Sequence, residues 1–143
     1  MKALDVAKYI INKGIEKEKP VSNLQLQKIL YFSHIDTIKA GKGKLVDEKF
    51  EAWDYGPVCR EVYNEFAPYG ANKMTITKNV DEEPEQEICD IIDKTINKHI
   101  DKSPWELVAE SHKEGSAWKE TYVSGAKKII DDKKIDKEAG VAK

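Results

Sequence analysis

The most informative segment of the sequence is Ser22-Asn-Leu-Gln-Leu-Gln-Lys-Ile-Leu-Tyr-Phe32. With the residues that follow, it predicts a helix over 23–40 that Ser22 or Asn23 caps and that Gly41 and Gly43 end. At 100° per residue, its apolar side chains lie on all sides of the helix. They are Leu24, Leu26, Ile29, Leu30, Tyr31, Phe32, Ile35 and Ile38. Because such a helix is usually surrounded by other elements, we expect it at the centre of the core.

Helical patterns flank this central segment on both sides. Residues 3–17 carry apolar side chains at three- and four-residue spacing, and Pro20 stops that helix. An apolar stripe follows Pro84, a capping box opens at Ser103, and Ser116 can cap a further short helix. The sequence therefore predicts a mainly α fold, a single-domain helical bundle around a central buried helix.

The remaining segments carry weaker signals. Residues 44–54 favour one or two short strands, a small β element beside the helices. Tyr55-Gly-Pro57 is predicted to be a turn, with Pro57 as the first residue of a helix that continues through Phe66 and ends at Pro68 to Gly70. Residues 71–83 are expected to form a loop, with a short strand at 74–77 as an alternative. The Lys-rich segment 126–143 is predicted to be either a marginal helix or a frayed tail.

Composition restricts the class of protein. The chain has 143 residues, of which 40% are hydrophobic and 35% charged, and this length suits one domain. It contains no apolar run long enough to cross a membrane, and Asp5 and Lys8 interrupt any signal-peptide pattern. Cys59 and Cys89 form neither a disulfide framework nor a CxxC motif. We therefore expect a reduced, cytoplasmic protein with no membrane partner.

The charge pattern argues against nucleic acid as the partner. The chain has 23 lysines and one arginine, and its pI is about 6.0, whereas sequence-reading proteins rely on arginine. Residues 1–45 carry a net charge of +5 and residues 46–100 a net charge of −7. Seven acidic residues and no basic ones lie between Asp81 and Asp93. This acidic segment is either a solvated surface or a patch for a basic partner protein.

No pattern in the sequence predicts catalysis, a metal site or a cofactor. The three histidines lack metal-ligand spacing, and His34 is expected to be a packed or hydrogen-bonded core residue. Phosphate-binding glycine motifs are absent from the sequence. A dyad of Cys59 with His112 is conceivable, but a small buried side chain is the favoured interpretation of Cys59. We therefore expect a binding protein and not an enzyme.

A cluster of aromatic residues surrounds the Gly-Pro turn. Trp53, Tyr55, Tyr63, Phe66 and Tyr69 fall within seventeen residues. One interpretation is that they cover the small helical core. The other is that some of them anchor a protein interface, since Trp and Tyr bury a large area with few rotatable bonds.

Two of these segments together resemble the Panacea antitoxin domain family, also called SocA-like. The first is the helix motif from Ser22 to Phe32, and the second is Phe50-Glu-Ala-Trp-Asp-Tyr-Gly-Pro-Val58. The resemblance spans roughly residues 3–125, which suggests a domain over 1–125 followed by the Lys-rich segment. Near its end, Ser111 and Ala117 stand where the family usually has threonine and proline.

The resemblance implies an antitoxin with no catalytic residue, which neutralises a toxin encoded nearby in a prophage or mobile element. The alternative is a proteolytic adaptor that delivers the toxin to a cytoplasmic protease, with residues 127–143 as a tether. A DNA-binding regulator is disfavoured, because a recognition helix needs an exposed polar face. We expect a basic toxin, leave the oligomeric state open, and predict the contact residues to be Trp53, Asp54, Tyr55, Gly56, Pro57 and Tyr63.

Overall fold

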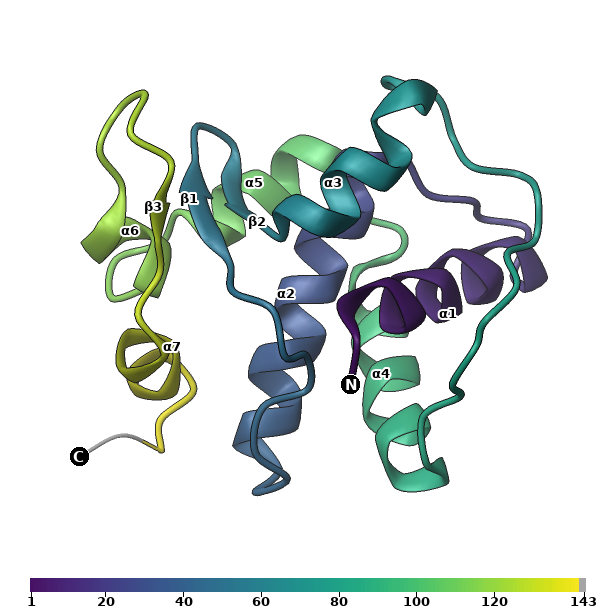
Figure 1. Cartoon of the computed structure of the whole chain (residues 1–143), viewed down its shortest axis with the longest axis horizontal. Helices are drawn as coiled ribbons and strands as arrows, with labels where there is room; N and C mark the ends of the chain where they lie inside the picture. The colour runs from purple at the N-terminus through teal and green to yellow at the C-terminus, as the bar shows by residue number, and fades with distance from the viewer. Residues whose placement is uncertain (142–143) are drawn as a thin grey trace.

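The central element of the computed structural model, which describes residues 1–141, is the helix α2 (Asn23–Lys39). Of the two caps predicted, Ser22 and Asn23, the structure uses Ser22, which forms a capping box with Gln25. All but three of its residues are buried, and it contacts α1, α3, α4, α5, α7 and β2 (Figure 1). The expectation of a buried central helix is therefore confirmed.

The described residues contain six further α-helices. They are α1 (Ala3–Glu16), α3 (Arg60–Phe66), α4 (Gln86–His99), α5 (Pro104–Ser111), α6 (Ala117–Thr121) and α7 (Asp132–Glu138). A 3-10 turn, η1 (Ala67–Tyr69), follows α3. The capping box at Ser103 and the cap at Ser116 both form, because each hydroxyl accepts a backbone N–H three residues later. The prediction of a mainly α fold with a small β element is confirmed.

The β element is a three-stranded antiparallel sheet of order β2-β1-β3. Its strands are β1 (Glu51–Trp53), β2 (Gly56–Val58) and β3 (Lys128–Ile129). The prediction that Pro57 begins a helix was wrong. Pro57 lies in β2 opposite Ala52, and the helix α3 begins only at Arg60. Asp54 and Tyr55 alone form the turn, so the two strands make a tight hairpin.

The C-terminal segment is an ordered part of the bundle. It forms β3 and α7, and it buries Ile130, Ile135 and Ala139 against the core. The carboxylate of Glu138 accepts hydrogen bonds from the Tyr31 hydroxyl at 2.6 Å and from the Ala117 backbone at 2.9 Å. Of the two alternatives predicted here, the structure therefore contains the helix; residues 142–143 lie outside the described part.

Two smaller predictions have clear outcomes. His34 is a buried histidine whose Nδ1 accepts hydrogen bonds from the backbone N–H groups of Leu45 and Val46, both at 3.3 Å. Its predicted role as a packed core residue is confirmed. Residues 71–83 form no strand, so the alternative of a strand at 74–77 was wrong, although Met74 is fully buried.

None of the helices in residues 1–141 is long and apolar enough to span a bilayer.

Candidate protein-binding site

The β1–β2 hairpin rests on a buried lysine of α2. The side chain of Lys28 is fully buried, and its Nζ donates a hydrogen bond to the carbonyl oxygen of Pro57 at 2.8 Å. Burial lowers the pKa of Lys28 to about 7. The Nζ atom therefore fixes the second strand of the hairpin to the N-terminal part of the central helix.

Gly56 allows the hairpin to approach this closely. Its φ is +111°, a conformation that side-chain-bearing residues rarely adopt. A Cβ atom at this position would lie 2.5 Å from the Ser111 Oγ and 2.8 Å from the Lys28 Cε. Position 56 therefore requires glycine on two independent grounds.

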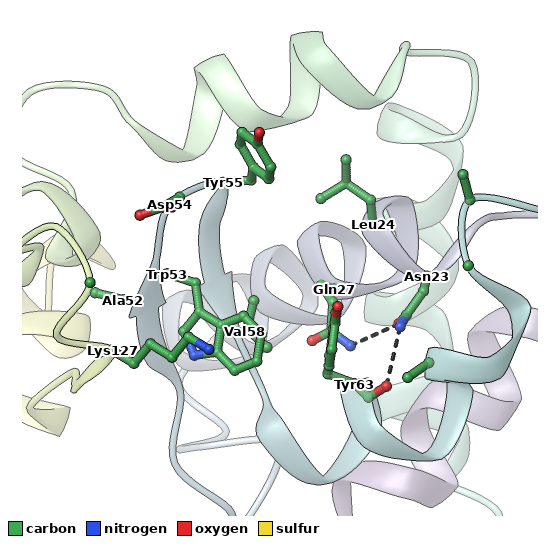
Figure 2. Close-up of a pocket in the computed structure, with 14 residues that line it drawn as sticks. Asn23, Leu24, Gln27, Ala52, Trp53, Asp54, Tyr55, Val58, Tyr63 and Lys127 are labelled. Carbon is green, nitrogen blue, oxygen red and sulfur yellow. Dashed lines mark hydrogen bonds between the residues drawn. The ribbon is translucent and has the colours of Figure 1, made fainter.

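An amide network fixes the segment that follows β2 to the start of α2. The Gln27 side chain accepts from the backbone N–H of Cys59 at 3.0 Å and donates to the Asn23 side chain at 3.1 Å. Asn23 in turn donates to the Tyr63 carbonyl oxygen at 3.3 Å. Figure 2 shows both of these donations by the amide nitrogens. The connection from β2 to α3 is consequently held at both ends.

Four aromatic side chains surround the outer side of this framework, and we call them the aromatic rim: Trp53, Tyr55, Tyr63 and Trp105. The ring centroids of Trp53 and Tyr63 are 4.8 Å apart, and those of Tyr55 and Trp105 are 5.2 Å apart in an edge-to-face arrangement. Tyr55 is 55% exposed and Trp105 is 60% exposed. The rim thus presents large apolar side chains to solvent on a rigid support.

A pocket of about 510 Å³ lies beside the rim. Its walls come from the start of α2, the hairpin, the α3–η1 region and the turn that precedes β3. Leu24, Val58, Trp53 and Tyr63 make part of the lining apolar (Figure 2). Segments distant in the sequence therefore build one concave surface.

Two cations lie near the Trp53 ring. The Lys127 Nζ is 4.3 Å from the ring centroid, and the guanidinium carbon of Arg60 is 5.4 Å from it. Arg60 also forms two hydrogen bonds with the Glu51 carboxylate, at 2.7 and 2.9 Å, and these bonds lower the pKa of Glu51. Asp54 accepts a hydrogen bond from the Tyr122 hydroxyl at 2.6 Å.

The structure brings the six predicted contact residues together in two layers. Tyr55, Tyr63 and Asp54 are exposed and Trp53 is half-buried, whereas Gly56 and Pro57 are buried beneath them. Their contact with a partner stays a prediction. The same region also contains three residues that the sequence analysis did not predict as contact residues: Leu24, Trp105 and Lys127. Trp105 alone carried a usable signal, since it lies within the capping box of α5 and off the apolar face of that helix.

Cys59 has the surroundings of a packed side chain. Its thiol is buried, and desolvation raises its pKa to about 12, so little thiolate forms at neutral pH. His112 stacks on the indole of Trp118, with ring centroids 3.6 Å apart. The interpretation of Cys59 as a small buried residue is confirmed.

The acidic segment lies away from the aromatic rim. Figure 1 shows α4 beginning at the lower right, whereas the hairpin lies at the upper left. Most carboxylates of the acidic segment are exposed. Asp93 accepts a hydrogen bond from the Tyr9 hydroxyl at 2.7 Å, and Glu87 forms a salt bridge with Lys42. Both interpretations of this segment, a solvated surface and a patch for a basic protein, are compatible with that exposure.

Comparison with known proteins identifies relatives of the chain. The family profile described as "Antitoxin SocA-like, Panacea domain" matches residues 26–119. The chain is also 33% identical, over 126 residues, to "Antitoxin SocA" of Caulobacter vibrioides (strain NA1000 / CB15N). That similarity covers 79% of this chain and 66% of the relative, so the chain spans just under two thirds of that protein's length. No solved structure matches the chain significantly.

Proposed function

The chain belongs to the SocA-like Panacea antitoxin family, and on that premise we propose that it neutralises a protein toxin by binding it directly. The toxin is encoded nearby, in a prophage or mobile element, and the complex forms in the cytoplasm. No catalytic step is part of this function. The observation that carries the proposal is the aromatic rim, an exposed apolar surface on a buried support.

The rim has the chemistry of an interface centre. Trp and Tyr dominate binding energies because each buries a large area and loses few rotamers on binding. The hairpin below them is fixed by Lys28 and by the amide network. Because this support is already ordered, little further entropy is lost when a partner docks.

A basic toxin would be attracted by the acidic residues between Asp81 and Asp93. Long-range attraction of this kind raises the association rate more than the final affinity. The acidic segment and the rim lie at separate places on the surface (Figure 1). We therefore assign steering to the acidic segment and the main contact to the rim.

Co-expression with the neighbouring gene tests this function. We expect the neighbour alone to arrest growth, and this chain to restore growth and to co-purify with the neighbour's product. Tyr55→Ala and Trp105→Ala should abolish both effects while the variants stay folded, because both side chains are mostly exposed. A harmless neighbour, or rescue by both variants as by the natural chain, would contradict the proposal.

Ile76→Ala is the matched control. Ile76 is a large apolar side chain that is 68% exposed, but it lies in the 71–83 loop and not in the rim. This variant should rescue growth as the natural chain does. If it fails to the same extent as Tyr55→Ala, general loss of apolar surface and not the rim explains the defect.

The same experiment distinguishes a proteolytic adaptor from a direct blocker. An adaptor would restore growth while the toxin level falls, and a blocker would leave the toxin level unchanged in a stable complex. Residues 127–141 cannot serve as a freely removable tether in this test, because Ile130 and Ile135 belong to the core. An adaptor surface is better sought among exposed side chains.

A further inference from the structure

The pocket beside the aromatic rim has at its edge one cation, Lys127, that forms no salt bridge with the described residues. Lys127 has no salt bridge or hydrogen bond to a carboxylate within residues 1–141, whereas Arg60 is held by Glu51. Asp54, the acid in the lining, accepts from the Tyr122 hydroxyl. The charge of Lys127 helps to lower the pKa of Glu51, but the hydrogen bonds of that carboxylate go to Arg60. The Nζ of Lys127 lies over the face of the Trp53 indole, so it stands between solvent and the apolar wall.

The backbone at Lys127 is strained. Its φ is +48°, and Glu18 at +58° is the one other non-glycine residue of the described chain with a positive φ. This conformation costs about 1–2 kcal/mol for a residue with a Cβ, and glycine adopts it freely. Gly125, two residues earlier, also has a positive φ, so the same turn has glycine at one such position and lysine at the other. A lysine in a position that favours glycine points to a role for its side chain.

The charge at the pocket differs from that of the acidic segment. Residues 81–93 present carboxylates to solvent, but none of them lines the pocket. The pocket instead combines an apolar wall with the Lys127 ammonium group, which forms no salt bridge within residues 1–141. Such a site complements a carboxylate next to an apolar side chain, and it disfavours a lysine or arginine.

We propose that this pocket receives a segment of the partner in which an acidic side chain adjoins an aromatic or aliphatic one. The carboxylate pairs with Lys127, and the apolar side chain packs on Trp53, Leu24 and Tyr63. This assignment rests on the proposed function and names the chemistry of its contact. The toxin is thus attracted through basic residues and is recognised, at the pocket, through an acidic one.

A random peptide library displayed on phage, selected against the full chain, tests this chemistry without knowledge of the toxin. We expect enrichment of peptides with Asp or Glu beside an aromatic or aliphatic residue. Selection against Lys127→Glu should lose these peptides. No enrichment, or enrichment of basic peptides by the natural chain, would overturn the proposal.

The affinity of one selected peptide for variants of Lys127 then distinguishes the effect of the lysine side chain from the effect of the strained backbone. Lys127→Gly relieves the backbone strain and removes the ammonium, so we expect an unchanged or higher Tm and about fivefold weaker binding. Lys127→Arg should bind within about twofold of the natural chain. Glu18→Gly is the matched control, since it relieves the same strain outside the pocket and should leave affinity unchanged. Binding by Lys127→Gly as tight as that of the natural chain would overturn the proposal.

Competition with the neighbour's product completes the test. A selected peptide that displaces it from this chain supports the assignment, and one that does not overturns the assignment of the pocket to the toxin. Neither result alters the growth rescue on which the antitoxin function depends. Conversely, acidic peptides that bind a chain unable to restore growth would contradict the antitoxin function and leave the chemistry of the pocket standing.

Discussion

The Nζ of Lys28 lies 2.8 Å from the carbonyl oxygen of Pro57, and the lysine side chain is fully buried. One hydrogen bond thus joins the two motifs that carry the family resemblance, the helix motif in α2 and the Gly-Pro segment in β2. A buried ammonium is costly, so this contact gives the stability of the fold a dependence on pH.

Stability should increase from pH 7.5 to pH 8.5. The pKa of Lys28 is about 7 in the folded chain and 10.5 for a free lysine, so the unfolded chain binds the extra proton in this range. The free energy of unfolding should therefore rise by about 1 kcal/mol per pH unit, below the limit of about 1.4 kcal/mol for one proton. Urea denaturation at several pH values measures this dependence of the free energy of unfolding on pH.

Lys28→Met should remove this slope, because methionine has no proton to lose. Lys94→Met is the matched control, since Lys94 is exposed on α4, and it should keep the slope of the natural chain. The measurement should stop below pH 9, where the unfolded chain begins to form the Cys59 thiolate. A flat profile in the natural chain would show that Lys28 is not buried as described.

Gly56→Ala should destabilise the fold strongly. The substitution combines a positive φ with contacts of 2.5 and 2.8 Å to Ser111 and Lys28, so we expect a loss of about 3 kcal/mol or more. Gly41→Ala isolates the backbone effect, because φ there is +80° and no atom lies within 4 Å of the added carbon. Its cost should be about 1–2 kcal/mol. Equal losses in thermal denaturation would argue against a close approach at Gly56.

Acid should destabilise the chain partly through His34. Burial lowers its pKa to about 4, against 6.5 for a free histidine, so the unfolded chain takes up this proton first as the pH falls. Between pH 6.5 and 4.5, His34 should cost about 2 kcal/mol of stability. His99 and His112 act in the same direction, because burial lowers both of their pKa values.

His34→Gln isolates that contribution. Its stability should fall less than that of the natural chain over the same pH range, although it starts from a lower value at pH 7. Comparing the two acid profiles by circular dichroism removes the shared effect of the carboxylates. Parallel profiles would contradict a neutral, buried His34.

The C-terminal segment should contribute to global stability. Ile135 on α7 is buried, so Ile135→Ala should cost about 2–5 kcal/mol. Ile129 in β3 is 61% exposed, and Ile129→Ala should change stability by about 0.5 kcal/mol at most. Equal effects of the two substitutions in urea denaturation would mean that α7 is not packed on the bundle.

Much of the helical framework was predictable because its signals are local. The capping box at Ser103 involves residues three apart and forms as expected, and the cap of α2 falls on Ser22, one of the two residues predicted for it. The prediction at Pro57 failed because proline suits a helix start as well as an edge strand, and only pairing with Ala52 distinguishes the two. The segment after residue 125 looked marginal because most of its residues are charged, and only its contacts with α2 and α6 show that it is packed.

The sequence by itself determined most of the helices, the capping box at Ser103, the central place of α2 and the family, because periodicity and motif spacing depend on neighbouring residues. Only the tertiary structure decided that Trp105 joins the aromatic rim and that Lys127 lies over Trp53. It also decided that Lys28, polar in the sequence, is fully buried against Pro57. These relationships join segments far apart in the chain, and their contacts arise only when the bundle brings those segments together.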